Sequence, residues 1–184
     1  MTQTIYLYGS DVLRKKAAEA DLTKREELTA LVQDLWDTLR QSDGCGLAAP
    51  QIGVSLRVLI VDGDGLADEY PYLKGFRRVM INPEIVEESD KQCEFSEGCL
   101  SVPGIYADVR RSASIRVAYW DEHFQRQEET LDRFACRMVQ HEMSHLDGVL
   151  FTDLLPPIRR KILAKKLQNI AHGKVATHYH AKIK

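Results

Sequence analysis

Apolar residues between positions 24 and 41 recur every three or four residues, which predicts a helix over this range. Thr23 followed by Glu26 has the form of a capping box, in which the two side chains would bond to free backbone N–H groups at the helix start. The apolar stripe indicates that this helix packs on the rest of the protein along one face. Its members are Leu28, Leu31, Val32, Leu35, Trp36 and Leu39.

Short runs rich in β-branched residues, separated by turn signals, predict strands in the middle of the chain. The expected strands are residues 57–61, 79–82, 85–88 and 115–119. They follow a small, apolar stretch, DGCGLAAPQIG (residues 43 to 53), whose glycines and proline predict an irregular loop.

Two later segments have helical periodicity. Residues 132 to 146 place apolar side chains on or near one side, namely Phe134, Ala135, Met138, Val139 and Met143. The last helix is expected to begin after Pro156-Pro157 and to stop at Gly173, since proline suits the first helical turn and glycine the position after the last turn.

Strands that cluster between helices, rather than alternate with them, favour an α+β fold. We expect small antiparallel or mixed sheets packed around the helix at 132–146, with the other helices towards the two ends of the chain. Residues 1–173 would form one domain, large enough to fold without a disulfide. Residues 174–184 are polar and basic without periodicity, and we expect a flexible tail in which His178 and His180 are ordinary exposed side chains.

Composition narrows the class of protein. The 184 residues carry a net charge of -2, which gives no global attraction to nucleic acid or anionic lipid. No signal-peptide pattern opens the chain and no run of 18 apolar residues occurs, so we expect a cytoplasmic protein without a membrane partner, and a monomer. The cysteines lack a CxxC pair, which favours buried residues, reactive thiols or metal ligands over disulfides; they are Cys45, Cys93, Cys99 and Cys136.

The stretch HEMSH, residues 141 to 145, is a candidate metal site. Side chains four residues apart lie on the same face of a helix, so both imidazoles could hold one ion while Glu142 faces a bound water. The alternative is a helix with two surface histidines. Met138 and Val139, just upstream, favour the metal interpretation, because they indicate a partly buried segment in which polar groups need partners.

Two histidines need a third ligand, and the sequence offers candidates on both sides. In zinc peptidases with the pattern HExxHxxGxxH that ligand lies downstream, but this chain has Phe151 where the last histidine belongs. No glutamate follows Glu142, so Asp147 and Asp153 are the remaining downstream carboxylates. Upstream, Cys99 could complete a catalytic set with one open position for water; alternatively, it is a small buried hydrophobic residue.

Three stretches, in this order, resemble the signature motifs of the peptide deformylase family. They are GCGLAAPQ (residues 44 to 51), EGCLS (97 to 101) and QHEMSH (140 to 145), and INP (81 to 83) and HLDGVLF (145 to 151) extend the similarity. The resemblance implies a metal-dependent hydrolase that removes the formyl group from the N-terminal formylmethionine of newly synthesised proteins. In that reaction a metal-bound hydroxide would attack the formyl carbon.

The resemblance also implies roles for single residues. Cys99, His141 and His145 would hold one divalent metal, with Fe(II) expected in the cell and Zn, Ni or Co in purified protein. Glu142 would act as general acid and base. The Gln51 amide and the Leu100 backbone N–H would stabilise negative charge on the formyl oxygen. The residues expected to contact the substrate are Gly44, Cys45, Gly46, Glu97, Gly98, Tyr106, Phe134 and Met138.

Two positions depart from the family pattern. The last motif usually reads HExDH, but residue 144 is Ser, so a hydroxyl takes the place of a carboxylate beside the metal ligands. Tyr106 stands where many members have Arg. Neither change affects a metal ligand or the expected general base.

The helix after Pro157 is similar to that of bacterial-type members, in which it is associated with ribosome docking. The resemblance therefore implies two partners, N-formylmethionyl nascent polypeptides and the ribosome. Two other functions are kept as alternatives. One is an HExxH peptidase that cuts internal peptide bonds with Asp147 or Asp153 as third ligand, and the other is a binding module that has kept the fold without catalysis.

Overall fold

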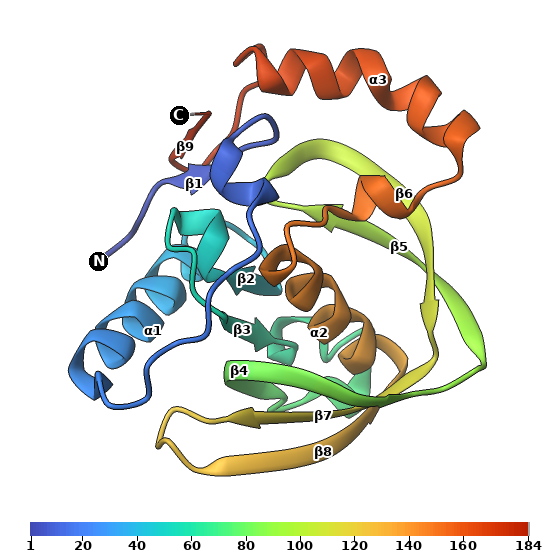
Figure 1. The fold of residues 1–184 in the computed structure, drawn as a ribbon. Helices are drawn as coiled ribbons and strands as arrows, with labels where there is room; N and C mark the ends of the chain where they lie inside the picture. Colours follow the sequence, from blue (N-terminus) through green and yellow to red (C-terminus); the bar gives the residue numbers. More distant parts are fainter. Residues whose placement is uncertain (184) are drawn as a thin grey trace.

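The central element of the fold is an antiparallel sheet with the strand order β2-β3-β4-β7-β8 (Figure 1). The computed structural model describes residues 1–183, and its α+β architecture is the one that the sequence predicts. The strands of the sheet are β2 (Gly46–Ala48), β3 (Val58–Asp62), β4 (Arg77–Glu88), β7 (Ser114–Trp120) and β8 (Arg126–Asp132).

The two runs predicted as separate strands, 79–82 and 85–88, join in the single strand β4. A bulge lies between Ile81 and Glu84, where Asn82 has a φ of 50°. The Asn82 side chain bonds to the backbone N–H and C=O of Ala20 at 2.7 and 2.9 Å. The bulge therefore attaches the N-terminal segment to the sheet.

The prediction of an irregular loop over residues 43–53 is wrong for most of its length. β2 pairs with β3, and Ala49–Ile52 form the short 3-10 helix η2. All residues from 46 to 52 are buried, because their small or apolar side chains allow close packing, and this burial overrides the glycine and proline signals. The other 3-10 helices are η1 (Asp11–Arg14), η3 (Asp64–Leu66), η4 (Pro71–Leu73) and η5 (Phe151–Leu154).

Two strands that the sequence pattern did not indicate form a long hairpin. β5 (Gln92–Cys99) and β6 (Val102–Ser112) pair in antiparallel register, with the turn between Cys99 and Val102. β5 is mostly polar and alternates between exposed and partly buried positions, so it lacks the β-branched run that reveals the other strands. β8 was missed for the same reason.

Helix α2 (Arg133–Leu146) lies between the sheet and the hairpin (Figure 1). Met138, Val139 and Met143 pack in one hydrophobic cluster with sheet residues such as Leu59 and Val117. Polar side chains of the helix are buried as well, and a helix buried on most sides must find partners for them in neighbouring elements. These polar residues are Arg137, Gln140, Glu142 and His145.

Helix α1 (Arg25–Arg40) packs on the other face of the sheet. Alternate residues of β3 supply both faces, since Val58 and Ile60 join the cluster under α1 while Leu59 and Val61 join the cluster under α2. The predicted capping box is wrong, because the Thr23 hydroxyl donates to the Asp21 carboxylate at 2.7 Å instead of capping the helix.

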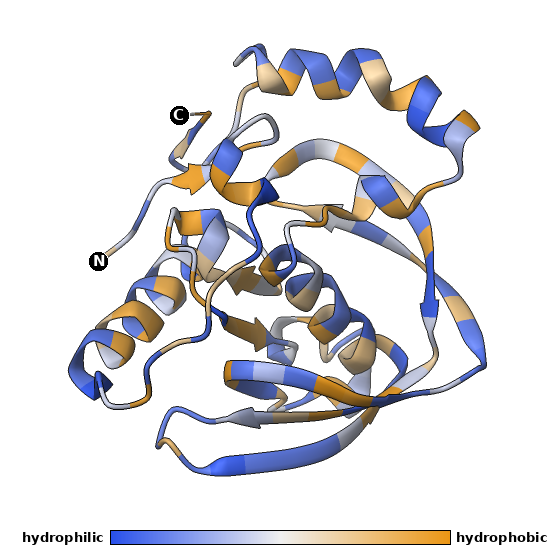
Figure 2. Cartoon of the chain, in the orientation of Figure 1, coloured by the Kyte–Doolittle hydropathy of each residue, from blue (hydrophilic) through white to orange (hydrophobic). Residues whose placement is uncertain are grey.

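Helix α3 (Pro157–Ala171) lies at the rim of the molecule beside β6. It begins and ends where the proline and glycine signals predict. Of its side chains, Leu167 and Ile170 are buried, whereas Ile158 and Ile162 are 65% and 69% exposed. Figure 2 shows hydrophobic and hydrophilic residues interspersed along the helix. Within residues 1–183 no helix has both the length and the hydropathy needed to cross a membrane.

The two ends of the chain meet beside the hairpin turn. β1 (Ile5–Tyr6) and β9 (Ala181–Lys182) pair in parallel, and the Ser10 hydroxyl donates to the Ile183 carbonyl at 2.5 Å. The polar segment after α3 thus runs back along the N-terminal strand, which its sequence pattern did not indicate.

Gly148 and Gly75 provide a matched test of the packing after α2. Both have a φ near 70°, but a Cβ at Gly148 would lie 2.6 Å from the Arg14 carbonyl oxygen, whereas a Cβ at Gly75 would meet no atom within 4 Å. Gly75→Ala should lower the free energy of unfolding by about 1–2 kcal/mol for the backbone alone. Gly148→Ala should lower the free energy of unfolding by the same amount and by roughly 1–3 kcal/mol more, because its Cβ would also clash with the Arg14 carbonyl. Urea denaturation measures both, and equal losses would contradict the packing described.

Candidate active site

The thiol of Cys99 and the imidazoles of His141 and His145 lie together between β5 and α2. Their ligand atoms are within 4.8 Å of one another, and Sγ of Cys99 is 3.2 Å from Nε2 of His145. Burial holds the pKa of His145 well below its usual range, so its imidazole is neutral, the form that binds a metal. The structure therefore brings together the three residues that were predicted as metal ligands.

The downstream carboxylates lie outside this cluster. Asp147 accepts a hydrogen bond from Arg57 at 2.8 Å, and Asp153 pairs with Arg14 at 2.5 Å. Both aspartates are thus engaged with arginines, which leaves the thiol as the third ligand that the geometry supports. This placement removes the structural basis for a peptidase with an aspartate ligand.

Glu142 lies beside the ligands, and its Oε2 has no hydrogen-bond partner among residues 1–183 although it is buried. Burial raises the pKa of this carboxyl to about 7. A buried polar atom that the protein leaves unbonded is suited to bind a water or a ligand. A thiolate and two imidazoles beside such a carboxylate fit a divalent ion such as Zn or Fe(II) with one position open.

The carboxylate of Glu97 is buried and binds three cationic or imidazole side chains. Its Oε2 lies 2.7 Å from Nδ1 of His141. Arg111 donates to it at 2.7 and 3.1 Å, and Arg137 donates at 2.8 Å. Burial alone would raise the pKa of Glu97, but hydrogen bonds from His141 and Arg111 hold it well below its usual range. The side chain expected to contact substrate is therefore engaged in orienting a ligand imidazole.

Ser144, the departure from the family motif, is bonded to the same arginine. Its hydroxyl accepts a hydrogen bond from Arg111 at 2.8 Å and donates to the Gln140 carbonyl at 3.0 Å. Arg137 is 2% exposed and also donates to backbone carbonyls of β5 and β6. Without a carboxylate at position 144, both arginines still have an acidic partner, because each bonds to Glu97.

Gln51 is held by η2 with its amide directed towards the hairpin turn. Its Oε1 accepts the Ala48 N–H at 2.8 Å, and its Nε2 lies 3.2 Å from Ser101 Oγ and 3.7 Å from Cys99 Sγ. Because the carbonyl end is bound to backbone, the donor end of the amide is oriented towards the ligand cluster. Leu100 lies in the same turn, next to Cys99.

Glycine is required near the catalytic groups by close approach. A Cβ at Gly46 would lie 2.5 Å from Oε1 of Glu142, and one at Gly98 would lie 2.4 Å from the ring of Tyr106. At Gly44 the nearest atom would be a methyl carbon of Leu100 at 2.8 Å. These glycines, predicted to lie along the substrate, also allow Glu142 and the hairpin turn to pack closely.

One end of the site is apolar. Met138 is 3% exposed, and Phe134 stacks on Tyr70 with ring centroids 5.1 Å apart. Burial raises the pKa of Cys45 to about 12, so its thiol stays protonated. Tyr106 is 73% exposed and lies on the other side of the opening.

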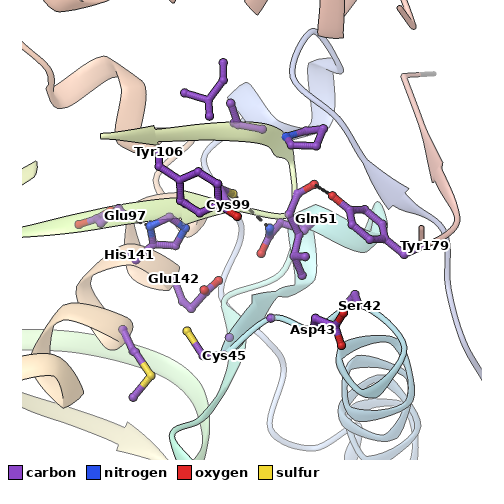
Figure 3. Close-up of a pocket in the computed structure, with 18 of the residues that line it drawn as sticks. Ser42, Asp43, Cys45, Gln51, Glu97, Cys99, Tyr106, His141, Glu142 and Tyr179 are labelled. Carbon is purple, nitrogen blue, oxygen red and sulfur yellow. Dashed lines mark hydrogen bonds and ion pairs between the residues drawn. The ribbon is translucent and has the colours of Figure 1, made fainter. Parts of the chain in front are cut away.

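A cavity of about 790 Å³ connects these groups (Figure 3). This volume lies within the range of about 300–1,000 Å³ typical of small-molecule sites. All residues predicted from the motifs line it except His145, which lies behind the cavity wall. Sequence reasoning missed Arg111 and Tyr179, which lie outside the motifs, and gave no role to Ser101, although it lies within EGCLS. Arg137 carried a signal, since it lies four positions before His141 and therefore on the same helix face as a predicted ligand.

Comparisons with known proteins agree on one family. Residues 2–161 match the family model described as "Polypeptide deformylase". The peptide deformylase of Christiangramia forsetii is 39% identical, covering 97% of this chain and 94% of that protein; the one from Pseudothermotoga lettingae is 43% identical, covering 97% and 98%. The crystal structure of a peptide deformylase from Legionella pneumophila superposes with a TM-score of 0.81 at 36% identity, covering 95% and 98%.

If Cys99 is a metal ligand, replacing it by serine should lower the metal content, whereas the same replacement at Cys136 should not. Cys99→Ser should leave the chain with much less than one metal ion, because a neutral hydroxyl replaces a thiolate. Cys136→Ser is the control, since Cys136 is buried in the same helix as the histidines but bonds to Gln140 and lies outside the ligand cluster. Metal content after anaerobic purification checks this, and full occupancy in Cys99→Ser would exclude the thiol as a ligand.

Proposed function

Since the chain belongs to the peptide deformylase family and is a deformylase hydrolase, we propose that it removes the formyl group from formylmethionyl polypeptides by metal-assisted hydrolysis. The observation that carries the mechanism is the cluster of Cys99, His141 and His145 next to the buried, unbonded carboxylate oxygen of Glu142. The products would be formate and a free amino terminus.

The three ligands would hold one divalent ion. Such an ion lowers the pKa of water and polarises a carbonyl oxygen. Fe(II) is the expected ion in the cell, and the same donor set accepts Zn, Ni or Co. The Glu97 carboxylate, bonded to Nδ1 of His141, would hold that imidazole in the orientation and tautomer that leaves Nε2 free for the ion.

Glu142 would transfer the protons. With a pKa raised to about 7 by burial, its carboxylate can take a proton from the attacking water near neutral pH. The same group can then donate that proton to the leaving amine. Gly46 leaves room for this carboxylate, since a Cβ at that position would lie 2.5 Å from its Oε1.

Gln51 and the hairpin turn would stabilise the charge that develops on the formyl oxygen. The Gln51 amide is already oriented by its bond to Ala48, so little reorganisation is needed when the charge appears. The Leu100 backbone N–H would be the second donor. Each such donor typically lowers the barrier by about 3–4 kcal/mol.

The methionine side chain would occupy the apolar end of the cavity, against Cys45, Phe134 and Met138. A flexible thioether packs well on such a surface. The peptide backbone would extend past Gly44, Gly46 and Gly98, where the absence of side chains permits close approach. Tyr106, at the opening, would contact the peptide from the side of β6.

Helix α3 would dock the enzyme on the ribosome, where formylated chains emerge. It carries five basic residues and no acidic residue, and all five are exposed: Arg159, Arg160, Lys161, Lys165 and Lys166. Positive charges in the first turns are repelled by the positive end of the helix dipole, so they do not stabilise the helix. An exposed basic helix can bind RNA phosphates even though the chain is slightly acidic overall. We expect such an enzyme to act in the cytoplasm and as a monomer.

Glu142→Ala should separate catalysis from metal binding. The variant should keep its metal, because the three ligands are unchanged, and lose about 10²- to 10⁴-fold in turnover, the range typical of general acid–base residues. Hydrolysis of a formylmethionyl peptide and metal analysis of the same sample measure the two effects. If the metal were lost as well, Glu142 would have to be a ligand.

Reversing the charges at Arg159, Arg160 and Lys161 should weaken co-sedimentation with ribosomes at low salt and leave hydrolysis of a short formyl-peptide unchanged. Wild-type binding should fall steeply as salt rises, since phosphate contacts release counterions. Reversal of three exposed lysines outside α3, Lys15, Lys16 and Lys91, is the control for total charge. Equal sedimentation of both variants would leave α3 without a docking role.

A further inference from the structure

The segment after α3 reaches the cavity that holds the catalytic residues. It is anchored beyond the cavity by β9 and by backbone bonds from Ile5 to His180 and from Leu7 to Lys182, at 2.9 and 2.8 Å. The four residues before this anchor, 176 to 179, line the cavity. A polar end of the chain is therefore held against the site rather than in open solvent.

Tyr179 attaches this segment to the hairpin turn. Its hydroxyl donates to the Leu100 carbonyl at 2.6 Å, one residue after the ligand Cys99. The ring is partly buried against a hydrophobic cluster, and burial raises the pKa of Tyr179 to about 12, so the hydroxyl remains a donor at neutral pH. In Figure 3 Tyr179 lies on the other side of Gln51 from His141 and Glu97.

His178 attaches the same segment to the opposite side of the opening. Its Nε2 lies 3.2 Å from the carboxylate of Asp43, the residue directly before Gly44. Residues 176–179 therefore extend from the hairpin turn to the loop before β2, and both of these flank the expected path of the peptide. Both partners of the His178 contact are exposed, so this contact can give way to a ligand.

We propose that residues 176–179 form the wall of the cleft that contacts the substrate residue following methionine. This inference rests on the proposed function and adds a specificity determinant to it. The methionine side chain is assigned to the apolar part of the cavity at Phe134 and Met138. Tyr179 lies away from His141, on the other side of Gln51 (Figure 3), and its segment bonds to Leu100 and Asp43. Every polypeptide substrate continues past its methionine, and the next side chain meets the aromatic ring of Tyr179 and the imidazole of His178.

The test compares the formylated tripeptides formyl-Met-Phe-Ser and formyl-Met-Ala-Ser. An aromatic side chain that packs on Tyr179 gains roughly 0.5–1.5 kcal/mol beyond area burial, so the wild-type enzyme should show a KM about 3- to 10-fold lower for the phenylalanine peptide. Two variants remove the wall, namely a chain that ends at Gly173 and the double variant His178→Ala/Tyr179→Ala, which loses both rings but keeps β9. Lys174→Ala is the control, because this side chain is exposed and outside the cavity.

In both variants the KM for the phenylalanine peptide should rise towards that for the alanine peptide, while the metal content stays within about twofold and Lys174→Ala keeps the wild-type ratio of the two KM values. If the truncated chain does not fold, the KM values of the double variant test the proposal. A wild-type preference that persists in a folded variant would overturn the proposal. A loss of kcat that is equal for both peptides would also overturn it, since Tyr179 would then act through Leu100 alone. Failure of the wild-type enzyme to hydrolyse either peptide would instead overturn the proposed function.

Discussion

The carboxylate of Glu97 determines how the hairpin and α2 fit together. It lies on β5 and binds Arg137 and His141 on α2, as well as Arg111 on β6, at distances of 2.7 to 3.1 Å. An isolated charge at this depth would cost several kcal/mol, so the carboxylate and Arg137 could not be buried without charged partners. The carboxylate that allows the polar side of α2 to be buried thus also bonds to His141, one of the three proposed metal ligands.

The rest of the site follows from this docking. Once the hairpin lies on α2, Cys99 at the end of β5 comes within reach of the two histidines, and the turn that follows places Ser101 against Gln51. β2 packs next to these groups, and the absence of a side chain at Gly46 allows the sheet to lie close to Glu142. Groups held in this way need little rearrangement as charge develops, which is how preorganised sites lower a barrier.

The periphery differs from this centre in its chemistry. α3 contributes few buried side chains and presents a basic surface, whereas the segment after it returns to the ligand-binding cavity. A single stretch of about 25 residues after Pro157 would therefore have two roles. It would bring the enzyme to nascent chains, and it would contact the substrate residue that follows methionine. Both roles concern the polypeptide part of the substrate, whereas the formyl group is bound by the central residues.

The amino-acid sequence by itself determined the features that depend on neighbours in the chain. Helical spacing located α1, α2 and α3, β-branched runs located β3, β4 and β7, and the spacing of His141 and His145 predicted a shared face, because side chains four apart on a helix are adjacent in any context. The resemblance of three short motifs was sufficient to indicate the family. The tertiary structure alone decided the polar hairpin, the role of the Glu97 side chain, the pairing of Arg137 and the return of the C-terminal segment. Glu97 and His141 are 44 residues apart, and Tyr179 and Leu100 are 79 apart. Such contacts depend on which polar groups become buried against each other, and local periodicity carries no information about that choice.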